Sequence, residues 1–461
     1  MPGRLLALCL AFGLMPCAAL AHAAEQGFVL LLPTDVYITA GVSAFVLTVI
    51  LVALMPARAS LRLFRVTWLP RIGGGRLRLV TSLIATVLFF ALVAIGLAGP
   101  YDPLSNLLPL TVWVVFWIGF LGLHALVGNL WPWIDPWAGL CALIFRDGAP
   151  PVRLPEWIGV WPAILFFGLF VSFSIADPVP MDPERLSMMA LGYWGLTFAG
   201  MALFGEDRWR RSGEFFSVLF YLLSLVSPLR LGAQAGLGFP GWAAVRSPGV
   251  STGGALFCLV ILGSGSFDGL NETFWWLNRI GVNPLDFQGR SSILWETVGG
   301  FVGTILLLIA VFYACVLTGC RLAGDGGPSV RLAFRRLALS TLPIALGFHV
   351  AHYLTTGLID GQYFVAALTD PFASGADYLG FGEVRVYVGF LRDSDTVRLI
   401  WLGQATVIVL AHVIAVLIAN AMARDMFPTA GKARRAELPL SLFMVAYTLF
   451  GLWLLAAARG A

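Results

Sequence analysis

The stretch LPIALGFHVAHYLTTG, residues 342–357, decides the fold because it is apolar along most of its length and lacks Asp, Glu, Lys and Arg. A bilayer core about 30 Å thick needs roughly 20 such residues in a helix, so 337–357 predicts one membrane-spanning helix. Ionisable side chains inside a membrane helix cost free energy and usually serve a function. The stretch therefore also directs attention to its two histidines, His349 and His352.

The rest of the chain repeats the same apolar pattern. Hydrophobic residues make up 59% and charged residues 12% of the 461 residues, against about 45–50% and about 25% in soluble domains. We therefore predict an all-α helical bundle of ten transmembrane helices in a lipid bilayer, with 24–461 forming a single integral membrane domain. The other nine spans are expected at 35–55, 79–98, 109–128, 157–176, 187–204, 252–267, 292–320, 396–421 and 438–458.

The N-terminus is typical of a signal peptide. Residues 1–23 contain Arg4, a short apolar core and the small-x-small sequence Ala21-His22-Ala23, which is the usual form of a cleavage site. We expect cleavage after Ala23, and an uncleaved first anchor is the alternative. Cleavage would remove His22 and leave four histidines in the mature chain.

The orientation follows from the basic residues. Lys and Arg gather in the cytoplasmic loops of membrane proteins, and most of the 29 basic residues fall between alternate predicted spans, at 56–78, 129–156, 205–251, 321–336 and 422–437. This pattern requires that the short apolar segment 214–227 does not span, so 205–251 is expected to lie at the inner face. Both termini are then periplasmic in a bacterial inner membrane. The net charge of +4 reflects this topology, and no nucleic-acid partner is predicted.

The sequence also excludes several common kinds of site. It has no phosphate-binding loop, dinucleotide fingerprint, HExxH or GxSxG motif, so no soluble-enzyme motif accounts for a function. Its six cysteines form no CxxC pair, which leaves a disulfide framework, a thiol zinc site and a covalently attached haem without their signatures. Any activity must be built from side chains within or beside the spans.

The four remaining histidines, His124, His349, His352 and His412, all fall inside predicted helices. A spacing of three places His349 and His352 on one helix face about one turn apart. Imidazole is the commonest metal ligand in proteins, so we predict that the histidines bind a divalent metal ion. His124 and His412 are expected at similar depth and could pair or join His349. The alternatives are simple hydrogen bonds to neighbouring helices and a proton relay.

Carboxylates at the predicted outer ends of the spans are candidates to complete this site. Asp268 follows the span 252–267, and Glu296 lies one turn into the next span. Either would complete the metal shell or act as a general base. Asp268-Gly269 and Asp360-Gly361 are also typical of loop turns. A deeper site of histidines alone would suit haem or copper instead.

Four stretches together resemble a bacterial family of multi-pass membrane proteins called fenitrothion hydrolase-like. They are LLLPTDVYITAG at 30–41, GNLWPWIDPWAGL at 128–140, LGSGSFDGLNETFWW at 262–276 and HVAHYL at 349–354. The similarity runs from about residue 28 to the end of the chain. It implies hydrolysis of the aryl ester bond of an organophosphorus compound. The HxH pair that holds metal in soluble phosphotriesterases does not occur in this chain, and no catalytic residue is carried over.

These observations predict a membrane-bound, metal-dependent phosphotriester hydrolase acting on small lipophilic substrates. His349 and His352 would hold the metal, and Glu296 and Asp268 would complete its shell or act as the general base. The competing prediction is a transporter or a haem or redox anchor that uses the same histidines for protons, metal or haem. The sequence indicates no particular protein partner.

Overall fold

The computed structural model describes residue 29 and residues 32–70, 74–145, 150–231, 235–284, 289–382 and 384–459. Within these residues, ten helical segments are long and apolar enough to cross a membrane. The prediction of an all-α, multi-pass membrane bundle is therefore confirmed. The signal peptide predicted at 1–23 lies outside the described residues.

Ten candidate spans form the bundle, several of them continuous with shorter helices. The long helices are α3 (Thr34–Leu54), α5 (Gly75–Ala98), α10 (Trp161–Ala176), α11 (Pro183–Phe204), α15 (Thr252–Asn271), α17 (Leu294–Ala323), α19 (Leu342–Thr369), α20 (Ser394–Met426) and α21 (Ala430–Ala456). The remaining span combines α6 (Leu107–Leu110), the π-helix η1 (Thr111–Phe120) and α7 (Leu121–Val127). The 3-10 helices η2 (Glu156–Ile158), η4 (Arg290–Ile293) and η5 (Ala338–Thr341) each adjoin a span.

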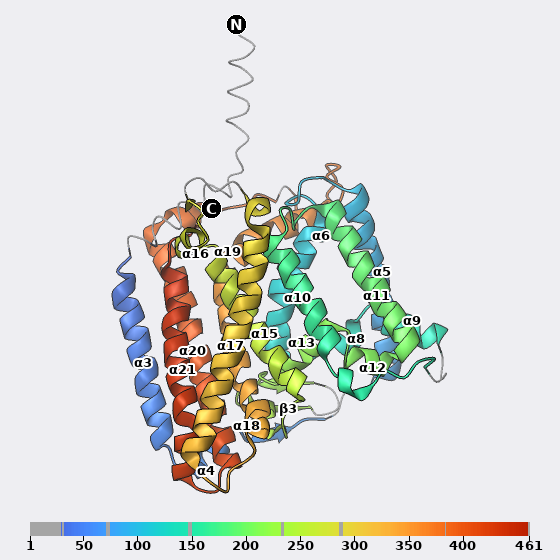
Figure 1. The fold of residues 1–461 in the computed structure, drawn as a ribbon. Coiled ribbons are helices and arrows are strands. Elements are labelled where there is room, and N and C mark those ends of the chain that lie inside the picture. The colour runs from blue at the N-terminus through green and yellow to red at the C-terminus, as the bar shows by residue number, and fades with distance from the viewer. Residues whose placement is uncertain are drawn as a thin grey trace.

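The other elements are short. They are α4 (Ala57–Leu63), α8 (Trp131–Ile134), α9 (Ala138–Ile144), α12 (Glu206–Arg210), α13 (Phe215–Ser224), α14 (Trp242–Arg246), α16 (Phe274–Arg279), α18 (Val330–Leu337), the 3-10 helix η6 (Gly389–Arg392) and the strands β1 (Val66–Trp68), β2 (Leu229–Arg230) and β3 (Gly236–Gly238). The strands form one antiparallel sheet in the order β1-β3-β2. Figure 1 shows α4, α18 and β3 toward one end of the bundle, and α16 and the C-terminus toward the other.

The centre of the bundle is formed by α15 and α19. These two spans are the most enclosed of the ten, and Figure 1 shows α17, α20 and α21 beside them, with α10 on the other side. By contrast, α3 packs against α20 and α21 and is the least enclosed of the ten candidate spans in the described residues. Side chains that project from α15 and α19 therefore meet protein on most sides, which is where membrane proteins place costly polar groups.

The segment 214–227 forms a helix that is shorter than the candidate spans. Its helix, α13, has 10 residues, which at 1.5 Å per residue gives about 15 Å, half of a bilayer core. Most of its side chains are buried against the bundle. A helix this short does not cross a membrane, and the cytoplasmic placement of 205–251 stays a prediction.

The turn alternative for the two Asp-Gly pairs is wrong. Asp268-Gly269 lies inside α15, which continues to Asn271, and Asp360-Gly361 lies inside α19, which continues to Thr369. Asp-Gly favours turns because both residues tolerate unusual backbone angles, but the packing of these central helices outweighs that local preference. The longer α15 keeps Asp268 on a helix face that points at α19.

Candidate functional site

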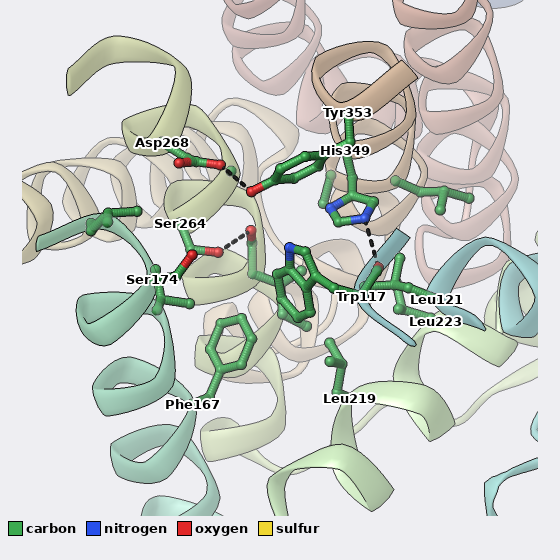
Figure 2. Close-up of a pocket in the computed structure, with 16 residues that line it drawn as sticks. Trp117, Leu121, Phe167, Ser174, Leu219, Leu223, Ser264, Asp268, His349 and Tyr353 are labelled. Carbon is green, nitrogen blue, oxygen red and sulfur yellow. Dashed lines mark hydrogen bonds between the residues drawn. The ribbon is translucent and has the colours of Figure 1, made fainter. Parts of the chain in front are cut away.

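The site is centred on Asp268 of α15, which contacts two consecutive residues of α19. The Tyr353 hydroxyl donates a hydrogen bond of 2.5 Å to Asp268 Oδ2, and His352 Nε2 lies 3.3 Å from the same oxygen. Figure 2 shows the tyrosine reaching across to the carboxylate. The structure thus brings together two of the residues predicted to form a site, Asp268 and His352.

The His352 ring is fixed on several sides. It stacks on Phe348 and meets the Tyr353 ring edge-on, with ring centroids 5.9 and 4.7 Å apart. Its Nδ1 atom is buried and has no hydrogen-bond partner among the described residues. With the Nε2 proton directed at Asp268, Nδ1 carries the free lone pair and is the basic atom of the ring.

His349 lies one turn earlier on α19 but has a different partner. Its Nε2 donates a 3.0 Å hydrogen bond to the backbone carbonyl of Trp117, as Figure 2 shows. Trp117 belongs to η1, and π-helical turns in long helices are often found at functional sites. His349 therefore joins α19 to this segment and faces the indole of Trp117 at a centroid distance of 5.3 Å.

The other two histidines lie apart from this centre. The Nδ1 of His124 donates to Phe120 O at 2.7 Å, and the ring stacks on Phe220. The Nδ1 of His412 donates to Ile408 O at 2.8 Å. Each therefore bonds a carbonyl of its own helical segment, whereas the bond from His349 to Trp117 joins two segments, as the hydrogen-bonding alternative expects. The Nε2 atom of each is buried without a partner in the described part of the chain.

Glu296 is not part of the cluster. It lies exposed in the first turn of α17, and it lines neither of the cavities that adjoin Asp268. Apolar neighbours on both sides in the sequence placed Glu296 in the span, but helix periodicity does not show which face meets lipid or solvent.

The side chains around Asp268 offer few ligands for the predicted metal ion. Across the described ranges, no three or more His, Cys, Asp or Glu side chains converge on a point. A catalytic zinc site usually has three protein ligands and an open position, whereas Asp268 and His352 supply two groups that contact each other. The residues present do not fit such an ion, so the chemistry below uses none.

Two cavities meet at Asp268. The wide cavity has a volume of about 510 Å³ and opens beside residues 455–459, near the C-terminus of the chain. Its wall includes His352, Trp401 and Gln404. The small cavity, about 40 Å³, continues past the carboxylate and includes His349 and Ser264. Both share the same four wall residues: Trp117, Ser174, Asp268 and Tyr353. The wide cavity has the size of a small-molecule site.

Two arginines line the wide cavity. Arg290 donates from Nη1 to the carbonyl of Ser174 at 3.0 Å, and Arg459 Nη1 lies 3.7 Å from Glu272 Oε2. Sequence reasoning missed both residues and Tyr353. A signal was present, because Arg290 and Arg459 fall in segments predicted to be outside, where the positive-inside rule makes basic residues scarce.

Comparisons with protein-family models, with curated proteins and with solved structures find no match for this chain. The resemblance to fenitrothion hydrolase-like proteins therefore stays a prediction. Asp268, His352 and Tyr353 contact one another and line the wide cavity, which makes them the candidate site.

Proposed function

We propose that the protein hydrolyses small lipophilic phosphoesters in the wide cavity, with His352 as the general base. The observation that carries this proposal is the contact between Asp268 and His352 at the wall of that cavity. A carboxylate beside an imidazole fixes its tautomer and stabilises the imidazolium that forms when the ring takes a proton. The resemblance to fenitrothion hydrolase-like proteins implies the same activity, but the proposal does not depend on it.

The reaction needs one water molecule. His352 Nδ1 removes a proton from water as the oxygen attacks phosphorus, a new P–O bond forms, and the P–O bond to the alcohol or phenol breaks. The proton then passes from His352 to the leaving oxygen, so the base is regenerated. Nδ1 is covered in the structure, and we expect the bound substrate to open its contact with water, since catalytic contacts often align only in the complex.

The remaining parts of the wide cavity suit such a substrate. Arg290 and Arg459 supply guanidinium donors, which bind phosphoryl oxygens well and stabilise charge that develops on them. Trp113 and Trp401 supply an aromatic wall for an apolar ester group. A lipophilic ester would enter this cavity through its opening beside residues 455–459.

The test is hydrolysis of a dialkyl 4-nitrophenyl phosphate by detergent-purified protein. His352→Gln removes the base, and we expect kcat to fall by roughly 10²- to 10⁴-fold, the usual contribution of general base catalysis. His412→Gln is the control, because His412 is another histidine enclosed in the bundle, and it lines neither cavity at Asp268. Equal activity of the wild type and the His352 variant would refute the proposal.

The metal and haem predicted from the sequence are tested separately. Elemental analysis of the purified protein detects a stoichiometric divalent ion, and visible absorbance detects haem. A stoichiometric metal that is lost in both His349→Ala and His352→Ala would restore the metal-dependent prediction in place of the scheme above.

A transporter is the second candidate, and the two adjoining cavities favour it. Asp268 and Tyr353 line both cavities, and transporters place substrate and ion sites inside the membrane, between their helices. Uptake of a lipophilic phosphate ester into proteoliposomes, without release of the alcohol or phenol, would favour transport over hydrolysis.

A further inference from the structure

We propose that the small cavity is a binding site for a dehydrated monovalent cation, held by Asp268, Ser264 and Ser174. This inference goes beyond the proposed function and applies whether the wide cavity serves hydrolysis or transport. It rests on one carboxylate oxygen, two hydroxyl groups and the charge of the cavity wall.

Asp268 has an oxygen available for a ligand. Both of its contacts, from Tyr353 and from His352, reach Oδ2. Oδ1 has no hydrogen-bond or ion-pair partner within the described ranges. Because the side chain lines the small cavity, Oδ1 is the atom that a ligand there would meet.

Two hydroxyl groups lie on the same side. Ser264 precedes Asp268 by four residues on α15, so the two side chains share one helix face. The Ser264 hydroxyl donates to the carbonyl of Ile261 at 2.8 Å, which leaves its lone pairs free to accept a cation. Ser174 reaches the same cavity from α10, and Figure 2 shows Ser174 beside Ser264 and below Asp268.

The charge of the wall favours a cation. None of the 16 residues around the small cavity is Lys or Arg. Asp268 receives its two contacts from a phenol and an imidazole, which are neutral donors unless His352 is protonated. A carboxylate buried in a membrane helix without a compensating charge is costly. A bound cation would supply that charge.

Size and ligand number select the class of ion. Among the divalent cations that prefer oxygen ligands, Ca²⁺ takes six to eight of them and Mg²⁺ keeps several of its waters. The small cavity offers one carboxylate and two hydroxyls in about 40 Å³, which leaves room for little more than one water molecule. An ion with a single charge fits this set, and it can enter from the wide cavity past the shared residue Ser174.

The experiment measures thermal unfolding of the full chain in detergent while NaCl replaces choline chloride at constant ionic strength. We expect the Tm of the wild type to rise with Na⁺ along a saturating curve. Ser264→Ala should weaken the apparent Na⁺ affinity about tenfold, and Asp268→Asn should abolish the response. Ser266→Ala is the matched control, since Ser266 lies on the same helix but bonds Tyr447, and it should keep the wild-type response.

Direct binding of radioactive Na⁺ to wild-type protein and to Ser264→Ala keeps the inference testable if Asp268→Asn does not fold. A cavity that holds only water would give no Na⁺-dependent Tm and no binding, and either result would overturn the proposal. The His352→Gln variant separates this site from the proposed function, because it should lose hydrolysis while it still binds Na⁺.

Discussion

Tyr353 holds the carboxylate of Asp268 in place, because its hydroxyl is one of the two groups that contact Asp268 Oδ2. A hydrogen bond to a charged group contributes about 1.5–3 kcal/mol. We expect Tyr353→Phe to lower kcat roughly ten- to a hundredfold with little change in KM, because the carboxylate then holds His352 less firmly. Kinetics on the aryl phosphotriester would measure this.

The control for this substitution is Tyr313→Phe. Tyr313 lies on α17, where 46% of its surface is exposed, and it lines neither cavity at Asp268. Its variant should match the wild type in both kinetic constants. Equal losses in the two variants would mean that the tyrosine next to His352 has no particular role.

Glu214 is a second enclosed carboxyl group that is held by hydrogen bonds, and it lies away from the two cavities at Asp268. It is fully buried at the start of α13, where it accepts hydrogen bonds from Trp131 and Tyr193 as well as from backbone N–H groups. Burial raises the pKa of this carboxyl above its ordinary value of 4.5. The folded state then holds the proton more tightly than the unfolded chain, so this contribution to stability falls as the pH rises from about 4.5 through the raised pKa.

We therefore expect the unfolding free energy of Glu214→Gln to depend less on pH in that window than the wild type does. Denaturant unfolding at a series of pH values would measure the two profiles. Glu184→Gln is the control, because Glu184 is exposed in the first turn of α11. Parallel profiles for wild type and Glu214→Gln would contradict the effect of burial.

Sequence reasoning identified part of the site at the residue scale. His352 and Asp268 stood out because ionisable groups are rare in apolar stretches. Tyr353 did not, since a tyrosine in a membrane helix is ordinary. Glu296 stood out for the same reason as Asp268, yet it lies exposed. Composition along a helix reveals that a charged group is present, whereas its partner depends on the rotation of the helix.

Among the helices, α13 is the one that decides how many times the chain crosses the membrane. Because α13 is too short to span, the segments before and after it should lie on one side of the membrane. Single cysteines at Arg208 and Pro240, in a background without the native cysteines, should react with the same membrane-impermeant reagent from the same side. Labelling from opposite sides would make 214–227 a true span.

Helix ends were predicted less well than helix centres. The span expected at 337–357 belongs to a helical segment that runs from Val330 to Thr369. Hydropathy marks the part of a helix that lies within the bilayer, but a helix continues into water as long as packing supports it. The π-helical turns of η1 were also not predicted, since they depend on how η1 packs against α19.

At the scale of the whole molecule, the number and position of the candidate membrane-spanning helices follow mainly from hydropathy. Each of the ten predicted spans overlaps a helix that is long and apolar enough to cross a membrane, because the cost of exposed backbone in lipid leaves few alternatives. The site is harder to predict. Asp268 and His352 are 84 residues apart, and nothing in one sequence specifies which faces of α15 and α19 meet.

Ten crossings by the candidate spans of the described residues would place the start of α3 and the end of α21 on one side of the membrane. The distribution of basic residues predicts that this side is the periplasm. Alkaline phosphatase fused after Arg459 should therefore be active in bacterial cells, and green fluorescent protein at the same position should be dim. The reverse pair of results would invert the orientation and place the opening of the wide cavity in the cytoplasm.

The residues shared by the two cavities would couple binding in one cavity to binding in the other. Asp268 and Tyr353 belong to both cavities, so an occupant of one changes the electrostatic field that an occupant of the other meets. Thermodynamic reciprocity then applies: if sodium multiplies the affinity for an ester analogue by some factor, the analogue must multiply the affinity for sodium by the same factor. Two titrations, each with the other compound present or absent, would give that factor twice.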